Sequence, residues 1–484
     1  MSNSIRLLAM IAMLGLVVGA CDDGTTPEGI GNDVEPQVIT GGGTADGPID
    51  GRLNVTALDD ETGDPLAGAF VMLGPGPDPE FSGTTDADGL ITFRNSAIKG
   101  EQQLTVLKAD YPVSQMHGLN AANLTLSMGE EDESSAAPDT ATITGTITGL
   151  DSLPVPPQGS FRVGIAGYTI PGLFDEDFEM VEQPEPGPGE LPGNMVSPDA
   201  GGDNTYELKT WVGRQAIYLL AGTITPGQGG EDTVFDITHF DIVRNVVTTK
   251  DETLADVDLA TDIALDQAST VAVGGVPAGT NRTNVIPILD LGEDGQIMIQ
   301  SFTDEDDDST FEGMLPELTG DLDDGSYLLV AQAYNEVCTG EGDERKCEEE
   351  PPTTLAVERD LAAADMTTAA IELMPPAGNL VVDTGSWTFS FSNPTGAELL
   401  MADIEDETTE DRVYNVTILN GSASEFTLTQ FPAEAGFAGL SGDLLWSQNA
   451  AVFVPGTDPN DIAFDDFQDL LLKMSGHEKS FTAQ

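Results

Sequence analysis

Residues 141–149 read Ala-Thr-Ile-Thr-Gly-Thr-Ile-Thr-Gly, a stretch in which apolar and polar positions alternate. Successive side chains of a β-strand point to opposite faces, so this alternation predicts a strand with one buried and one solvated face. Shorter alternating segments separated by turn residues recur about every ten residues along the chain, a pattern typical of antiparallel sandwiches. The sequence therefore predicts an all-β protein built from tandem antiparallel sandwiches, immunoglobulin-like or transthyretin-like.

Length and charge narrow the classes of protein that this chain can belong to. Its 484 residues exceed what one core accommodates, so we expect about three or four domains. Lys and Arg number 17 against 84 Asp and Glu, a formal net charge of -67. Such a field repels nucleic acid and anionic lipid headgroups, so we expect no nucleic-acid partner and no membrane binding of the polybasic type. The acids are scattered along the chain, which favours adaptation to a salty medium, with divalent cations or basic partners as the alternatives.

The N-terminus has the features of an export signal. Arg6 precedes an unbroken apolar run over residues 7–20, which is too short to span a bilayer. Residues 18–21 read Val-Gly-Ala-Cys and resemble the lipobox of bacterial lipoproteins. The resemblance implies cleavage before Cys21, lipid on that residue, and a membrane-anchored protein of the cell envelope outside the cytoplasm. Residues 22–23, Asp-Asp, resemble an inner-membrane retention signal of some bacteria, so inner and outer membranes both stay open.

Composition and patterning divide the chain into segments. We expect a signal peptide over 1–20 and a flexible acidic, Gly-rich tether over 21–50, followed by a sandwich over 51–129 and a linker over 130–140. After the linker we expect a sandwich with a Pro/Gly-rich insertion over 141–267, a sandwich with a disulfide hairpin over 268–376, and a β-rich domain over 377–484. Tyr-Leu-Leu at 218–220 and at 327–329 suggests that two of the sandwiches are repeats. One short helix is expected in the last domain, over Phe464–Met474.

The first sandwich resembles a known family. Residues 62–71 read Thr-Gly-Asp-Pro-Leu-Ala-Gly-Ala-Phe-Val, and residues 84–89 read Thr-Thr-Asp-Ala-Asp-Gly. Together they resemble the carboxypeptidase regulatory-like domain over roughly residues 50–128. The resemblance implies a transthyretin-like, or prealbumin-like, sandwich that serves as a non-catalytic accessory module and is sometimes grouped with carbohydrate-binding-like folds. Residues 109–111, Ala-Asp-Tyr, depart from the usual Gly-Tyr of the family.

The remaining two cysteines bracket a short acidic loop. Cys338 and Cys347 flank residues 339–346, and in an exported protein such a pair most simply forms a disulfide. Closing a loop of about ten residues stabilises a fold by roughly 2.5–3 kcal/mol in the chain-entropy model. Zinc binding is the alternative, but no histidine is near and the spacing does not suit a zinc knuckle.

One acidic segment is a weak candidate for calcium. Asp304, Asp306 and Asp308 alternate within a run of carboxylates, and hard Ca²⁺ prefers such oxygen ligands. A calcium loop counted from Asp304 would need Gly and Glu where Ser309 and Leu315 stand. A solvated acidic hairpin is the favoured interpretation, so no metal ligand and no cofactor are assigned.

Enzyme signatures are missing from the sequence. The three histidines, His117, His239 and His477, are far apart, and the chain contains no His-Glu-x-x-His, Gly-x-Ser-x-Gly or Walker motif. The sequence therefore predicts a non-enzymatic, lipid-anchored cell-envelope protein that acts as a surface display, adhesion or binding module for an unknown protein or glycan. An unrecognised hydrolase would require a deep pocket with a histidine beside a nucleophile.

A second candidate function is a carbohydrate-binding accessory lipoprotein of a polysaccharide-handling system. Its sugar-stacking platforms would be Trp211, Trp387 and Trp446. Trp387 lies in Ser-Trp-Thr-Phe-Ser-Phe, where the aromatic residues share one face, and this placement favours burial in a core. Coplanar aromatics on an open surface would support the carbohydrate hypothesis.

Overall fold

The computed structural model describes residues 37–39, 41–60, 62–76, 80–129, 139–172, 181, 183–184, 186, 191–200, 203–226, 234–302, 309–339, 346–409, 411–432, 435–437 and 439–483. Regular structure in these residues is almost entirely β-strand, which confirms the all-β prediction. None of their helices is long and apolar enough to cross a membrane. Cys21 with the signal before it, and the segment that holds Asp304, Asp306 and Asp308, lie outside the described residues.

The first sandwich, unit 1, spans residues 43–128. Its strands are β1 (Gly43–Ala45), β2 (Asp50–Asp59), β3 (Phe70–Leu73), β4 (Phe81–Thr84), β5 (Leu90–Lys99), β6 (Gln102–Leu107), β7 (Val113–Leu119) and β8 (Asn123–Met128). One sheet has the order β1-β8-β2-β5, and β7-β6-β3-β4 form the other. Leu53, Val55 and Ala57 alternate along β2 and are fully buried, because a period-two pattern places them all on the face between the sheets.

Unit 2 spans residues 140–260. It contains β9 (Thr140–Thr148), η1 (Leu150–Ser152), β10 (Phe161–Tyr168), β11 (Met195–Val196), η2 (Pro198–Ala200), β12 (Thr205–Trp211), β13 (Gly213–Thr225), β14 (Val234–Thr248), β15 (Thr253–Leu254) and β16 (Leu259–Ala260). One sheet is built on β9 and β12, and the other runs β11-β10-β13-β14. Ile143 and Ile147 of the alternating stretch lie on β9 and are fully buried in the core of this unit.

Unit 3 spans residues 263–372. It contains β17 (Ile263–Gly274), β18 (Arg282–Asp290), η3 (Gly292–Asp294), β19 (Gln296–Met298), β20 (Thr310–Pro316), η4 (Gly320–Leu322), β21 (Ser326–Thr339), β22 (Lys346–Leu361), η6 (Asp365–Thr368) and β23 (Ala369–Glu372). β17, β20 and β23 form one layer, and β19-β18-β21-β22 form the other. The long hairpin of β21 and β22 carries both cysteines near its tip.

Unit 4 spans residues 378–483. It contains β24 (Gly378–Asp383), β25 (Thr388–Ser392), β26 (Leu399–Asp406), β27 (Arg412–Ile418), β28 (Glu425–Thr427), β29 (Gly442–Phe453), η8 (Pro459–Asp461), η9 (Phe464–Asp466), α2 (Phe467–Leu470) and β30 (Leu471–Ala483). The sheet β24-β25-β28 packs on β27-β26-β29-β30. Trp446 and Phe389 meet in the core between them.

The helix expected over Phe464–Met474 extends too far. Residues 464–466 form the 3-10 helix η9 and residues 467–470 form α2, but β30 begins at Leu471, so the expectation is wrong for residues 471–474. Phe464, Phe467 and Leu471 have helix-like spacing and are all buried, which explains the expectation. β30 pairs with β29 along almost its whole length and also with β22, and these two hydrogen-bonded neighbours outweigh the local pattern.

Units 1, 2 and 3 repeat one strand order. Strands are counted from β2 in unit 1, from β9 in unit 2 and from β17 in unit 3. The first strand then pairs with the fourth, the second with the third and fifth, and the fifth with the sixth, while the seventh runs parallel to the first. The two Tyr-Leu-Leu segments lie on the equivalent fifth strands β13 and β21. Unit 4 keeps the same four pairings among its six strands β25 to β30, and β24 pairs antiparallel with β25 in place of a seventh strand.

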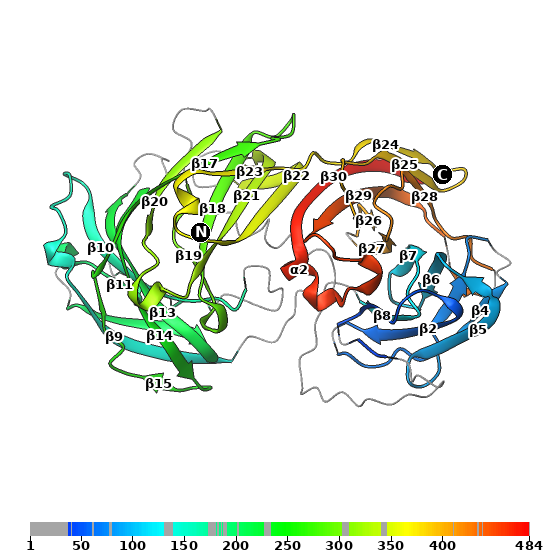
Figure 1. Ribbon diagram of the computed structural model, residues 1–484, viewed down its shortest axis with the longest axis horizontal. Coiled ribbons are helices and arrows are strands. Elements are labelled where there is room, and N and C mark those ends of the chain that lie inside the picture. The colour runs from blue at the N-terminus through cyan, green and yellow to red at the C-terminus, as the bar shows by residue number, and fades with distance from the viewer. Residues whose placement is uncertain are drawn as a thin grey trace.

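The units are joined edge to edge, and their order in space differs from their order in the chain. β14 of unit 2 pairs with β17 of unit 3, β22 of unit 3 with β30 of unit 4, and β27 of unit 4 with β7 of unit 1. The last two junctions create a continuous 12-stranded sheet. Figure 1 shows the blue N-terminal unit beside the orange and red C-terminal strands, with units 2 and 3 in the other lobe. Strand edges that could recruit other chains are thereby covered.

The largest apolar core is shared by three units. It contains Val106 of unit 1, Ile288 of unit 3 and Phe453 of unit 4, all buried. The strands of unit 3 in the long sheet bury both faces, because Ile288 and Leu289 belong to different cores. Units that share a core and a sheet cannot move as independent domains, so we expect them to unfold together as one cooperative body.

Candidate functional site

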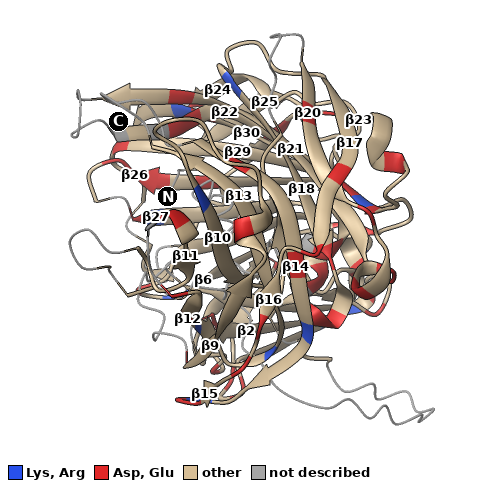
Figure 2. Cartoon of the chain, turned by 90° about the vertical axis from the view of Figure 1, so that its left-hand side faces the viewer, with Lys and Arg blue, Asp and Glu red and all other residues tan. Residues whose placement is uncertain are grey.

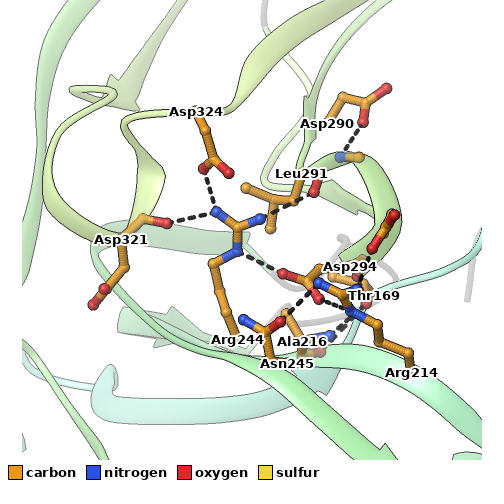
Figure 3. Close-up of polar contacts among 12 residues, drawn as sticks. Thr169, Arg214, Ala216, Arg244, Asn245, Asp290, Leu291, Asp294, Asp321 and Asp324 are labelled. Atoms are coloured by element: carbon orange, nitrogen blue, oxygen red, sulfur yellow. Dashed lines mark hydrogen bonds and ion pairs between the residues drawn. The ribbon is translucent and has the colours of Figure 1, made fainter.

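A buried ion cluster joins units 2 and 3 (Figure 3). Asp294 of η3 is fully buried, and its carboxylate accepts hydrogen bonds from Nε of Arg214 at 2.8 Å and from Nε of Arg244 at 2.7 Å. Arg214 lies on β13 and Arg244 on β14, so unit 2 supplies both cations and unit 3 the anion. Burying an unpaired carboxylate costs several kcal/mol, and the two guanidinium groups offset that cost.

Further partners fix both guanidinium groups. Arg214 also pairs with Glu293, and its Nη2 donates to Oδ1 of Asn245 at 2.7 Å. Arg244 pairs with Asp324 and donates to the main-chain oxygen of Asp321 at 3.1 Å. These contacts hold the two units in one relative orientation.

The junction between units 1 and 4 is also polar and buried. Gln115 of β7 donates from Nε2 to the Thr427 carbonyl at 2.9 Å and accepts at Oε1 from the Thr429 amide at 2.9 Å. The same Nε2 lies 2.5 Å from Nε2 of His117. Because the Gln115 amide nitrogen can only donate, the His117 nitrogen must accept, and the ring must be neutral. Burial lowers the pKa of His117 to about 4, which agrees with a neutral ring at pH 7.

A cavity of about 280 Å³ lies at the end of β2 in unit 1. Its walls include three carboxylate-bearing residues, Asp59, Asp60 and Asp88, together with Val38 and Gly41 of the segment that precedes β1. Gly63 and Pro65, from the motif that resembles the carboxypeptidase regulatory-like domain, also line it. A cavity with this wall has the chemistry to hold a cation or an amine rather than an anion.

Asp59 has a structural role beside this cavity. Its Oδ1 accepts from the Thr62 amide at 2.9 Å, which shapes the turn after β2. Its Oδ2 accepts from the Tyr111 hydroxyl, and this hydrogen bond to the carboxylate is the first cause that raises the pKa of Tyr111 to about 12. Asp86 caps the neighbouring turn, since its Oδ1 accepts from the amides of Asp88 and Leu90 at 3.0 Å. Both acids are therefore turn formers.

Cys338 and Cys347 form a disulfide across the β21–β22 hairpin, where they are directly opposite each other. Glu336 is close enough that its carboxylate and the two sulfurs lie within 4.8 Å of one another. Both sulfurs are consumed by the S–S bond, so this group offers no thiolate to a metal. The structure therefore contains the predicted disulfide and not the alternative zinc site.

Glu349 lies opposite Glu336 in the same hairpin. Neither of its carboxylate oxygens has a hydrogen-bond partner among the described residues. Burial raises the pKa of Glu349 to about 7, and the charge of Glu336 adds to the effect. Glu336 itself pairs with Arg282 at 2.8 Å.

The three tryptophans pack against cores. Trp446 is fully buried and meets Phe389 edge to face, with ring centroids 5.0 Å apart. Trp211 is partly buried, and its indole nitrogen donates to the Thr169 carbonyl at 3.0 Å. Trp387 is partly buried against the same core as Phe389. These three side chains do not form a shared open platform.

The three histidines lie in three different units, on β7, β14 and β30. His239 shares a hydrogen bond with its neighbour Thr238 at 3.0 Å, and burial lowers the pKa of His477. Within the part of the chain that the structure describes, no histidine is hydrogen-bonded to a serine or cysteine.

The ion cluster was not singled out from the sequence. Asp294 is one of 84 acidic residues, so its identity alone carries no signal. The scarcity of cations could have helped, because each of the 17 Lys and Arg residues stands out in such an acidic chain. Figure 2 shows this imbalance, with Asp and Glu spread over the visible strands and loops and few Lys or Arg among them.

No protein-family model and no curated protein sequence matches the chain. Among solved structures it is similar to the Bacillus anthracis TIE protein, at 11% identity over 67% of this chain and 50% of that one, with a TM-score of 0.13. It is also similar to the shaft pilin SpaA from Lactobacillus rhamnosus GG (9% identity, 44% and 97% covered, TM-score 0.14). A tetra-tandem repeat in the extending region of a large adhesion protein matches at 13% identity (90% and 100% covered, TM-score 0.13). Similarity at this level says nothing about function.

Proposed function

We propose that this chain is a non-enzymatic, lipid-anchored cell-envelope protein that serves as a rigid display or binding platform. The observation that carries the proposal is the joining of four sandwiches into one body by continuous sheets. A scaffold of this kind holds loops at its surface in fixed positions, which is what a binding module requires.

The N-terminal segment is tied to the folded body at a defined place. The Thr44 amide donates to the Ile462 carbonyl at 2.9 Å, and the Thr44 hydroxyl donates to the Pro459 carbonyl at 3.1 Å. A tether leading back toward Cys21 would therefore attach beside the contact between units 1 and 4. We propose that lipid on Cys21 holds the body at the membrane through this tether.

Carbohydrate binding is the second candidate function. The resemblance of unit 1 to the carboxypeptidase regulatory-like domain favours an accessory module, and the cavity at the end of β2 is lined partly by the motif residues. The core positions of Trp446, Trp211 and Trp387 weigh against sugar stacking. We therefore place this function below display and adhesion.

The proposal is tested on intact cells that produce either the natural chain or Cys21→Ser. We expect a labelled fatty acid to be incorporated into the natural chain and not into Cys21→Ser. We also expect a protease added outside the cells to cleave the natural chain, once any outer membrane has been made permeable to the protease. Pull-down and glycan-array screening, with and without Ca²⁺, then identify the ligand class. A cytoplasmic, unlabelled protein that starts at Met1 would overturn the proposal.

A further inference from the structure

Two arginines face each other on adjacent strands of unit 1. Arg52 of β2 and Arg94 of β5 are directly opposite in the antiparallel register. The neighbouring pairs Leu53–Phe93 and Val55–Ile91 point into the core, so the arginine pair lies on the outer face of the sheet. Side chains directly opposite each other have Cβ atoms about 4.5–5.5 Å apart, and like charges in this position destabilise a sheet.

A buried polar floor lies next to this pair. Asn54 is 3% exposed, and its Oδ1 accepts from Nε of Arg52 at 3.2 Å and from the hydroxyl of Thr92 at 2.8 Å. The amide nitrogen of Asn54 donates to Oδ1 of Asn123 on β8 at 2.5 Å. The inner edge of the Arg52 guanidinium is thus held by the protein, and no hydrogen bond from its terminal nitrogens to a described residue was found.

Among the described residues, neither arginine has a charged partner, although the chain is rich in acids. Seven other basic side chains form ion pairs with carboxylates, namely Lys99, Arg162, Arg214, Arg244, Lys250, Arg282 and Arg412. Arg52 and Arg94 form none with the carboxylates of the described residues. In a chain with 84 Asp and Glu residues, leaving two opposed cations unpaired is a cost that folding alone does not explain.

We propose that Arg52 and Arg94 form a binding site for a doubly charged oxyanion of the phosphate type. Two guanidinium groups at directly opposite positions of adjacent strands offer several N–H donors and two charges, a better match to a dianion than to a single carboxylate. Lys99 of β5 is paired with Asp50 at 2.7 Å and is not counted in the site. The bound oxyanion removes the repulsion between the two arginines.

The net charge of the protein sets the range over which this site acts. A formal charge of -67 repels anions at long range, but salt screens this repulsion beyond about 10 Å at 0.1 M ionic strength. Charge-assisted hydrogen bonds at contact distance are screened much less when the donor side chain packs against buried polar groups, as Arg52 does against Asn54.

The phosphate can be a free ion or a lipid headgroup. The Ile39 amide donates to Thr125 on the same sheet, so the segment that leads toward Cys21 leaves from near this face.

The test measures binding of inorganic phosphate to the purified protein, by calorimetry and by thermal melting, against chloride at matched ionic strength. We expect saturable phosphate binding and a rise in the melting temperature. In Arg52→Gln/Arg94→Gln, affinity should fall at least tenfold and the rise should vanish. Without phosphate, the double variant should melt no lower than the natural protein, because a like-charge contact has been removed. This last result also establishes that the variant is folded.

The matched control is Lys209→Gln/Lys250→Gln, which removes two positive charges from unit 2 and should bind phosphate as the natural protein does. A second arm replaces phosphate with vesicles that contain phosphatidic acid, whose phosphomonoester can carry two negative charges, or with vesicles of phosphatidylcholine alone. It uses Cys21→Ser, so that acylation plays no part. Arginine-dependent binding to phosphatidic acid assigns the site to headgroups, and binding of the free ion alone assigns it to soluble phosphate. Absence of saturable phosphate binding, or equal loss in the lysine control, overturns the proposal.

Discussion

Arg244 of unit 2 and Asp294 of unit 3 form an ion pair across the junction of the two units, with Nε 2.7 Å from Oδ2. The carboxylate is fully buried, and Arg214 binds its other oxygen. Such a pair contributes little net stability compared with an apolar contact, but it allows only one relative orientation of its partners. The cluster therefore acts mainly as an alignment device, and the paired strands β14 and β17 supply the continuity.

Replacing Asp294 by Asn should damage this junction. The change leaves two guanidinium groups facing a neutral amide, and breaking a buried pair in this way costs about 3 kcal/mol. Chemical denaturation should show a lower unfolding midpoint, and units 2 and 3 should unfold in two separate transitions. Asp324→Asn is the control, because this carboxylate also contacts Arg244 but is mostly exposed, and its loss should cost less than about 1 kcal/mol. Equal effects of the two changes would contradict the assigned role.

The junction of units 1 and 4 should weaken in mild acid. Burial lowers the pKa of His117 from 6.5 to about 4, so the unfolded chain takes up a proton before the folded one does. The contribution of His117 to stability is complete above pH 6.5 and falls as the pH drops toward 4, by about 2 kcal/mol at pH 5. His117→Gln keeps an acceptor for Gln115 and does not titrate. The difference between the two proteins in urea midpoint should therefore change between pH 7.5 and pH 5, and a constant difference would refute the assignment.

Glu349 should have the opposite pH dependence. Its raised pKa of about 7 means that the folded state holds the proton more tightly, so the cost of burying this carboxylate is present above pH 7 and disappears toward pH 4.5. Glu349→Gln should raise the melting temperature at pH 8 and leave it nearly unchanged at pH 4.5. The adjacent and exposed Glu350 provides the matched control, since Glu350→Gln should change little at either pH. A variant that melts lower at pH 8 would show that the charged form is the stable one.

The disulfide should stabilise the tip of its hairpin. Cys338 and Cys347 are 9 residues apart, and closing a loop of this size contributes about 2.5 kcal/mol in the chain-entropy model. Cys338→Ser/Cys347→Ser should lower the free energy of unfolding by that amount, as measured by chemical denaturation. A reducing agent should have the same effect on the natural protein and none on the double variant. Insensitivity of the natural protein to reduction would contradict this prediction.

Local patterns predicted the strands and the class of fold. The alternation at 141–149 forms β9, and the apolar positions of β2 face the core, because period-two patterns depend only on neighbouring residues. The disulfide was predictable for the same reason, since its two cysteines bracket one short turn. The repeated Tyr-Leu-Leu correctly indicated equivalent strands in units 2 and 3.

Long-range pairing left no such signal. β7 and β27 lie side by side although they are far apart in the sequence, since Val113 pairs with Tyr414. Nothing in either strand selects the other, because any exposed strand edge of suitable length could pair with it. The ion cluster depends on three side chains from two units that meet only after both have folded. The predicted helix extends too far because the pairing of β30 with two strands, which decides the conformation of residues 471–474, is invisible in residues 464–474.

Unit 1 pairs with unit 4, so that the sandwiches form a joined body and not an open string. Ser114 of β7 and Asn415 of β27 are direct partners and both line a small cavity, which leaves room for a cross-link. In a protein with Cys21→Ser, the pair Ser114→Cys and Asn415→Cys should form a disulfide under mild oxidation, detected by peptide mass spectrometry. Asn415→Cys with Thr205→Cys of unit 2 should not. Failure of the first pair to cross-link, or equal cross-linking of both pairs, would contradict the joined arrangement.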